Sequence, residues 1–293
     1  MLLLLLLASG CRSLSGAGPA SSEIVSCRDQ WQQGLEALQH QEWTQAESLF
    51  AGAVRTCPQD ERARKYYSDV LWHRGAWDDA TRQMQEAVNL SGGDPALLVR
   101  LGEMYIAQGY FDEAEACAAE SLSRQVDLAG AWALSGDIHW QHGRRSAAID
   151  DYHRALSLQS GSPRVQLALA RASFAENDPE QALVTLHALK DSTPSAELSH
   201  DVFYLEGMIH KSLRRYEDAA RSFREVAQRG QGGSLLFYEI ANAEMLSGHP
   251  EPARRAAQIA LAWDAAHEPT RQLLAQINSM QIRMAANAVR LPK

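Results

Sequence analysis

The sequence repeats its apolar skeleton at an interval of 34 residues. The segment EWTQAESLFAGAV, residues 42–54, is followed by AWDDATRQMQEAV, residues 76–88, with Trp43 aligned on Trp77. Nearly every polar residue changes between the two segments, while the spacing of the apolar residues is kept. A fixed period of this length indicates stacked structural repeats, because a single unit cannot bury its apolar face without neighbours.

Seven segments align in this way, and each has alanine at its fifth position. Every interval between these alanines is 34 residues except one of 37, which falls at the turn-forming stretch DSTPSAELS, residues 191–199. The seven alanines are Ala46, Ala80, Ala114, Ala148, Ala182, Ala219 and Ala253. A small residue precedes each of them by 12 positions: Gly34, Ser68, Gly102, Gly136, Ala170, Gly207 and Ala241.

This pattern predicts two helices in each unit. Apolar residues recur at helical spacing on both sides of glycine-containing breaks such as AQGY (107–110) and QHGR (141–144). We expect the small residue of the first helix to let the two backbones approach closely. The aromatic residue that begins several second helices is expected to fill the gap between units. These residues are Trp43, Trp77, Phe111 and Tyr216.

The skeleton resembles the tetratricopeptide repeat, a helix-turn-helix unit of 34 residues. The matching residues are Leu101-Gly102, Tyr105, Trp132, Phe50, Tyr152, Phe223, Ala53, Ala87, Ala155, Ala260, Pro58 and Pro194, with the seven alanines. Ser68 replaces the first-helix glycine, and Ala118 and Ala257 replace the large aromatic of the second helix. The resemblance implies an all-α, right-handed α-solenoid of seven units within residues 23–267, at about 27–60, 61–94, 95–128, 129–162, 163–199, 200–233 and 234–267.

Residues 268–293 are predicted to form a C-terminal capping helix. Pro269 falls in its first turn, and apolar residues follow along one face, while the other face is polar. A cap covers the last repeat and presents a soluble surface, although a stripe that contains methionine could instead dock a partner helix. The apolar face consists of Leu273, Ile277, Met280, Met284 and Ala288.

The N-terminus begins with an apolar run, Leu2–Leu7, that continues into ASGC and then into a stretch without periodicity. This resembles a bacterial lipoprotein signal, which implies a signal peptide at 1–10, a lipidated Cys11 and a flexible tether at 11–22. No basic residue precedes the leucines, and Ala8 stands where the lipoprotein pattern prefers leucine. The expected location is the bacterial cell envelope, membrane-anchored and facing the periplasm or exterior. An ordinary cleaved signal or a cytosolic leader are the alternatives, and the last would make the protein cytoplasmic.

No catalytic or cofactor-binding pattern occurs in the sequence. Phosphate loops, dinucleotide fingerprints, nucleophile elbows and zinc-protease motifs are all missing, so we expect no enzyme activity, no cofactor and no small-molecule substrate. His139 and His142 share a helix face, but two histidines are too few for a zinc site. A net charge of −8 without a basic run argues against nucleic-acid binding.

Three cysteines remain after Cys11. Cys27 begins the first helix of the first unit and Cys57 ends its second helix, and an antiparallel hairpin brings those two ends together. A disulfide between them would close a loop of about 31 residues and contribute roughly 3–4 kcal/mol in the chain-entropy model. The alternative is two reduced thiols at the edge of the core. Cys117 lies mid-helix and is expected to be a small packing residue.

The resemblance also implies a concave binding face made by the first helices. Aromatic residues alternate with charges at the family's inner-face phases, which suits an extended peptide or a partner helix. Because Asp69 and not asparagine follows Lys65, the clamp that holds a C-terminal carboxylate in the chaperone-binding branch is not expected. The predicted groove residues are Arg62, Lys65, Asp69, Trp72, Glu103, Asp137, Trp140, Arg164, Arg171, Phe174, Tyr204, Tyr238 and Asn242, with Arg28 and Trp31 in the first unit.

The sequence therefore predicts a non-catalytic scaffold or adaptor that binds a protein or peptide partner and is attached to a membrane by its lipid anchor. We expect the aromatic residues of the groove, Trp72 and Trp140 above all, to be exposed and to contribute little to the stability of the fold. The alternative is an auxiliary subunit, possibly cytosolic, of an enzyme or secretion complex whose partner performs the chemistry.

Overall fold

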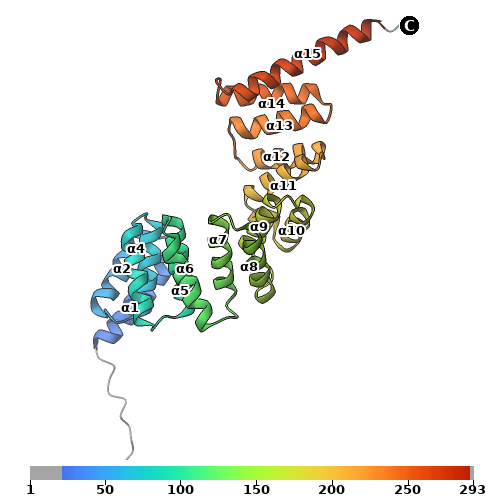
Figure 1. Ribbon diagram of the computed structural model, residues 1–293. Helices are drawn as coiled ribbons and strands as arrows, with labels where there is room; N and C mark the ends of the chain where they lie inside the picture. Colours follow the sequence, from blue (N-terminus) through green and yellow to red (C-terminus); the bar gives the residue numbers. More distant parts are fainter. Residues whose placement is uncertain (1–21, 291–293) are drawn as a thin grey trace, which may run out of the picture. The chain divides into compact units, whose positions relative to one another are not determined.

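The computed structural model describes the backbone of residues 22–290 and the side-chain environment of residues 26–280 and 282 (Figure 1). Within these residues the chain is all-helical, with fifteen α-helices, one short 3₁₀ helix and no strand. The first helices of the seven pairs are α1 Ser22–Gln39, α3 Glu61–His73, α5 Pro95–Gln108, α7 Ala129–Gln141, α9 Pro163–Ala175, α11 His200–Ser212 and α13 Ser234–Leu246. The second helices are α2 Trp43–Thr56, α4 Trp77–Leu90, α6 Phe111–Arg124, α8 Arg145–Leu158, α10 Pro179–Ser192, α12 Tyr216–Gln228 and α14 Pro250–Trp263. The last helix is α15 Glu268–Arg290, and the 3₁₀ helix η1 is Ser195–Glu197.

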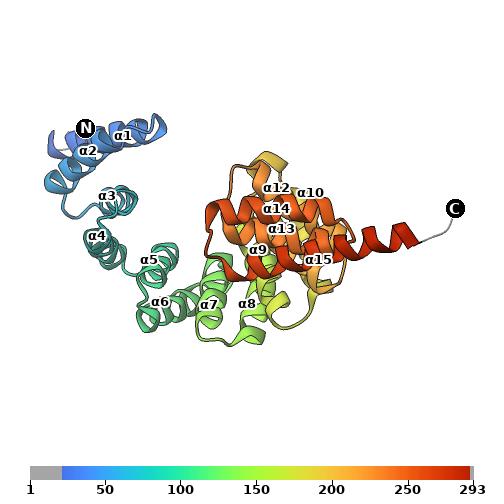
Figure 2. The same cartoon turned by 90° about the horizontal axis from the view of Figure 1, so that it is seen from above.

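The chain forms two compact units, Met1–Tyr110 and Phe111–Lys293. In the first unit, each helix from α1 to α5 packs against the next one in the sequence. In the second unit the same holds from α6 to α15 (Figure 2). The boundary between the two compact units falls between the two helices of the third repeat. It therefore does not coincide with a boundary between repeats.

The turns inside the seven repeats share one backbone conformation. Each contains a residue with positive φ, located five positions before the repeat's alanine. Glycine adopts this conformation without steric cost, as Gly109 does at the end of α5 with φ 83°. The sequence breaks at AQGY and QHGR are therefore the interhelical turns that were predicted. The seven residues are Gln41, Gly75, Gly109, Gly143, Asn177, Arg214 and Gly248.

The small residue of the first helix has a different purpose from the one predicted. It is glycine in the first, third, fourth and sixth repeats, and in all of these but the third it faces the aromatic ring of a buried residue in the second helix. A Cβ added at Gly207 would lie 2.6 Å from Phe223 Cε1, and one added at Gly136 would lie 2.6 Å from Tyr152 Cε1. The glycine thus leaves room for a ring, and direct contact between the two backbones is not what requires it.

Helix α15 covers the last repeat over the first part of its length. It contacts both α13 and α14, and Thr270, Leu273 and Ile277 are buried there. Met280, predicted to belong to the covered face, is 37 % exposed, and the helix continues beyond α14 (Figure 1). The side chains of Met284 and Ala288 lie outside the described residues. Of the described residues on the predicted apolar face, Leu273 and Ile277 are therefore covered and Met280 is not.

Membrane attachment through a spanning helix finds no support within residues 22–290. None of the helices described there combines the length and the apolar character needed to cross a bilayer. The predicted lipidation site, Cys11, and the predicted tether up to residue 21 lie outside the described residues.

Candidate protein-binding surface

Within each unit, we call the side of the first helices that carries the predicted groove residues the inner face. In the second unit, α7 contacts α9, α9 contacts α11, and α13 contacts α15. Side chains also join one first helix to the next, as Lys211 Nζ of α11 does with Glu239 Oε2 of α13 at 2.5 Å. Within this unit, helix contacts and this ion pair therefore link α7, α9, α11 and α13 in sequence order.

Each first helix of the second unit from α7 to α13 contributes an aromatic residue at an inner-face phase. These residues are half-buried, which corrects the expectation that they are exposed. Trp140 packs against the core cluster around Tyr152, and Phe174 packs against the larger core of the later repeats. The ring centroids of Tyr204 and Phe223 are 5.5 Å apart. The aromatic row therefore belongs partly to the inner face and partly to the core.

The aromatic residues of the first unit behave in the same way. Trp72 is half-buried, with its ring centroid 6.3 Å from that of Trp77. Trp31 is also half-buried and stacks on Tyr66 at 6.5 Å. Both predicted groove tryptophans therefore have intramolecular partners and contribute to the fold.

The aromatic residues at the start of second helices fill the space between repeats unevenly. Trp43 stacks on His73 of the next repeat, with ring centroids 3.5 Å apart. Trp77, however, remains 56 % exposed, and its main aromatic neighbour, Trp72, belongs to its own repeat. The prediction that these residues fill gaps between units holds for Trp43 and not for the indole of Trp77.

Two predicted groove charges of the first unit, Asp69 and Glu103, are joined across repeats by Arg100. Arg100 Nε donates to Asp69 Oδ1 at 3.1 Å, and Arg100 Nη1 lies 3.4 Å from Glu103 Oε2. Lys65 Nζ is 4.0 Å from the second oxygen of Asp69. Arg100 was missed because it does not fall at an inner-face phase, and its contact depends on the packing of α5 against the preceding repeat.

The second unit repeats this arrangement. Arg164 Nη1 lies 2.5 Å from Asp137 Oδ2, and the other oxygen of Asp137 accepts a hydrogen bond from the Tyr152 hydroxyl at 2.8 Å. Arg171 Nη2 lies 2.7 Å from Asp201 Oδ2 on the next first helix. Burial of Tyr152, together with the Asp137 charge beside it, raises the pKa of its phenol above the ordinary value. The charges therefore neutralise one another along the inner face.

The remaining polar residue of the predicted groove is Asn242 on α13. It is half-buried, at the same phase as Asp137 and Arg171 in earlier repeats. Tyr238, four positions before it, has its ring centroid 5.5 Å from that of His267 in an edge-on arrangement.

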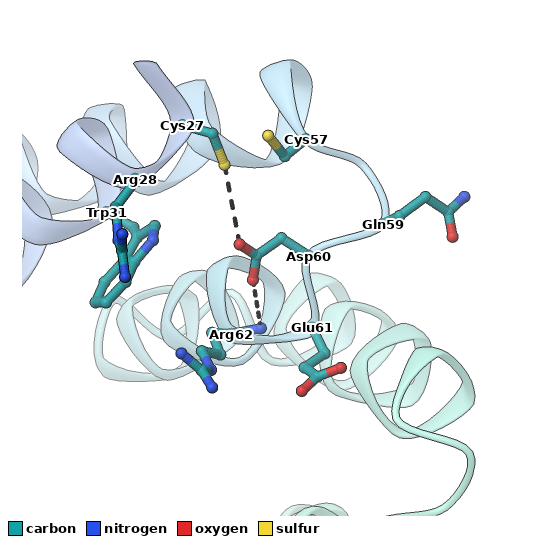
Figure 3. Close-up of a pocket in the computed structure, with 8 residues that line it drawn as sticks. All are labelled: Cys27, Arg28, Trp31, Cys57, Gln59, Asp60, Glu61 and Arg62. Atoms are coloured by element: carbon teal, nitrogen blue, oxygen red, sulfur yellow. Dashed lines mark hydrogen bonds between the residues drawn. The ribbon is translucent and has the colours of Figure 1, made fainter. Parts of the chain in front are cut away.

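A pocket of about 440 Å³ opens in the first unit between the start of α1, the end of α2 and the start of α3 (Figure 3). Arg28 and Arg62, both exposed, stand at its edge, and no ion pair of either is found within the described residues. Trp31 forms part of the wall. Cys27 and Cys57 meet in the same pocket, so the structure brings this predicted pair together as reduced thiols, without a disulfide. The pairing stays a prediction.

A second pocket, of about 260 Å³, results from the three extra residues of the fifth repeat. The η1 segment turns Leu198 into a position beside Leu167 and Leu189, and Arg164 and Glu197 line the same space. The sequence signal for it is the single interval of 37 residues, which by itself indicates only a longer loop. The pocket is mainly apolar and would accept an apolar side chain of a partner.

The other residues whose side chains could take part in chemistry are held in contacts that belong to the fold. His139 Nε2 lies 3.6 Å from Asp151 Oδ2, and burial raises the pKa of this carboxyl. Within the described residues, no group of three or more metal-ligating side chains converges. Cys117 is buried, and burial raises its thiol pKa to about 11, as fits a packing residue.

Comparison with protein families gives a direct assignment. Two family models, both described as tetratricopeptide repeat, match residues 32–95, 99–163 and 139–200. The chain belongs to the tetratricopeptide repeat family. Its paired helices, small anchor residues and positive-φ turns are the structural form of these repeats, and the family is one of protein-interaction scaffolds.

Solved tetratricopeptide repeat structures share the fold at low sequence identity. A tetratricopeptide repeat protein from Parabacteroides merdae superimposes with a TM-score of 0.60 at 14 % identity, covering 86 % of this chain and 99 % of its own. PilW, described as a type IV pilus biogenesis factor, gives 0.58 at 15 % identity, covering 85 % and 98 %. YrrB, described as having an unusual peptide-binding site, gives 0.56 at 16 % identity, covering 64 % and 96 %. No curated protein sequence matches this chain significantly.

Proposed function

We propose that this protein is a non-catalytic adaptor of the bacterial envelope that holds a partner protein by an extended segment laid along the inner face. The observation that carries the proposal is the aromatic row of the second unit, Trp140, Phe174, Tyr204 and Tyr238, one residue from each of four successive first helices. Half-buried rings offer contact area that is already fixed in position, so little side-chain entropy is lost when a partner binds.

The pairing of the inner-face charges indicates what kind of partner segment fits. Because Asp137 is already engaged by Arg164, and Asp201 by Arg171, a charged peptide would gain little from those groups. Partner affinity should therefore depend mainly on apolar side chains, one of which fits the pocket beside Leu198. We expect weak dependence of binding on ionic strength, in contrast to a purely electrostatic site.

The resemblance of ASGC to a lipoprotein signal supports attachment to the envelope through acyl groups on Cys11. The fold is shared with PilW, a pilus biogenesis factor, and with YrrB, whose description names a peptide-binding site, and this likeness supports an adaptor without identifying its partner. A Cys11→Ser protein should leave the membrane fraction after a carbonate wash. If it remains there, the lipid anchor is refuted, and a wild-type protein found in the soluble fraction would favour a cytosolic auxiliary subunit.

Site-specific photo-crosslinking in cells tests the inner face directly. Benzoylphenylalanine would replace Phe174 or Tyr238, whose aromatic side chains it resembles in shape. A matched position on the outside is Val184 of the second helix α10, which is 61 % exposed. The proposal requires partner adducts from the two inner positions and none from Val184. Adducts from Val184 alone would place the partner on the second helices and refute this function.

A further inference from the structure

The first-unit pocket holds two thiols on neighbouring helices. Cys27 lies on α1, and Cys57 is the residue that ends α2. In Figure 3 the Cys57 side chain points toward Cys27, and both thiols line the same pocket. The two thiols therefore have each other as neighbours in one pocket, whereas Cys117 lies apart from them on α6.

The two thiols differ in access. Cys27 is 2 % exposed and packs with Ala53 and Ala63. Cys57 is half-buried and lines the open pocket. Burial, the neighbouring Cys57 and Asp60 raise the pKa of the Cys27 thiol to about 12. Since only the thiolate attacks a disulfide, Cys27 does not react first at neutral pH.

Asp60 holds a fixed position beside Cys27. Its Oδ1 caps α3 by accepting hydrogen bonds from the Arg62 and Ala63 amides at 2.9 and 3.1 Å. Its Oδ2 faces Cys27 Sγ at 3.9 Å (Figure 3). The carboxylate therefore has one oxygen committed to the helix and one oriented toward the buried thiol.

We propose that Cys27 and Cys57 form a reversible intramolecular disulfide by exchange with a disulfide oxidant, with Cys57 as the entry residue and Cys27 as the residue that closes the bond. This inference rests on the pocket and is independent of the adaptor function. Disulfides of this kind persist in oxidising compartments, and a protein of the bacterial envelope would meet disulfide oxidants there.

The reaction has two balanced steps. The Cys57 thiolate attacks one sulfur of the oxidant, so that a Cys57–oxidant disulfide forms and the other half of the oxidant leaves as a thiolate. The Cys27 sulfur then attacks the Cys57 sulfur, which breaks the mixed disulfide and releases the second half. The proton lost by Cys57 and the Cys27 proton pass through water to the two released thiolates. In all, two electrons and two protons move from the protein to the oxidant.

The test uses the folded full chain and glutathione disulfide as the oxidant. After incubation, thiols are alkylated under native conditions and the peptides are mapped by mass spectrometry, with reductant added in a parallel sample. We expect a reducible Cys27–Cys57 cross-link, while Cys117 alkylates only after unfolding. Free alkylation of both Cys27 and Cys57 in the native oxidised sample, or a cross-link that forms only in urea, would overturn the proposal.

Two variants test the order of reaction. Cys27→Ala should accumulate a glutathione adduct on Cys57, because the closing thiol is missing. Cys57→Ala should leave Cys27 unmodified over the same time, since the entry thiol is missing. An adduct on Cys27 in the second variant would refute the order. Circular dichroism shows whether each variant folds, and the wild-type map decides the bridge itself even if a variant does not.

Discussion

Replacing Gly207 with alanine should destabilise the sixth repeat, although alanine is the better helix former. The new Cβ would lie 2.6 Å from Phe223 Cε1, 2.7 Å from Cδ1 and 2.9 Å from Cζ. Carbon atoms attract best at about 3.5–4.0 Å, so the ring must retreat by about 1 Å. Phe223 is fully buried, so a displaced ring presses on the core residues around it.

The expected magnitude follows from two opposing terms. Overpacking a tight core usually costs about 1–3 kcal/mol. We expect about 2–3 kcal/mol for Gly207→Ala because the new Cβ meets three ring atoms at once. The gain in helix propensity from glycine to alanine returns about 1 kcal/mol. The net loss of about 1–2 kcal/mol corresponds to a fall in Tm of roughly 2–8 °C for a domain of this size.

The assay is thermal and urea unfolding of Gly207→Ala, Phe223→Leu and the double variant. The fifth repeat has the pair Ala170 and Leu186 at the same two positions, so the double variant reproduces a combination the chain already contains. We expect the double variant to be more stable than the sum of the single changes predicts, with a coupling of about 1 kcal/mol or more.

Gly52→Ala is the matched control. Its Cβ would first meet the flexible Gln30 side chain, at 3.3 Å, and no ring. This change should be neutral or stabilising, by up to about 1 kcal/mol. The reasoning is refuted if Gly207→Ala melts at or above the wild-type temperature, or if Phe223→Leu and Gly207→Ala are simply additive.

Trp140→Ala should weaken partner binding by about 2 kcal/mol, roughly thirtyfold in Kd, and should also lower Tm because the ring packs on the core. Trp263→Ala, at a residue 64 % exposed, is the control and should leave Tm almost unchanged; a fall as large as that of Trp140→Ala would contradict the burial argument. Burial lowers the pKa of His210 below its ordinary value of 6.5. As the pH falls below about 6.5, His210 therefore takes up a proton more readily in the unfolded chain than in the folded chain. Stability should therefore decrease between pH 7 and 5, roughly, and His210→Gln should flatten that slope in urea titrations; an unchanged slope would exclude His210 as its source. Lys190→Met removes the cation 2.7 Å from the buried Glu206 and should cost about 3 kcal/mol, as measured by urea unfolding; an unchanged free energy of unfolding would contradict this.

The sequence predicts the repeat architecture because each unit carries its own signals. The spacing from Gly207 to Ala219, the Gly109 turn and the proline at the start of α9 are local features that act within one helix pair. Helices in a repeat protein also pack mainly on sequence neighbours, so local periodicity and tertiary contact coincide. For this reason, the helix pairs and their turns could be predicted from the spacing of apolar and small residues alone.

The burial and the charge pairing of the inner-face side chains could not be predicted from the spacing of residues along the chain. Whether Trp140 is exposed depends on how closely α7, α8 and α9 pack, and the same phase of the repeat is compatible with wall or core. Asp137 and Asp201 find their arginines about one repeat length away, on another helix, at distances that no local pattern specifies.

The same limit applies to the two pockets and to the small residues of the first helices. The three extra residues near Leu198 were visible in the sequence, but the apolar pocket they form depends on side chains from α9, α10 and α11. Gly207 was recognised as necessarily small, yet only the structure shows that the Phe223 ring is the reason. The sequence by itself determined the helices and their order, since these depend on spacing along the chain. The tertiary structure decided burial, charge pairing and cavity shape, since these depend on atoms that helix packing brings together from different repeats.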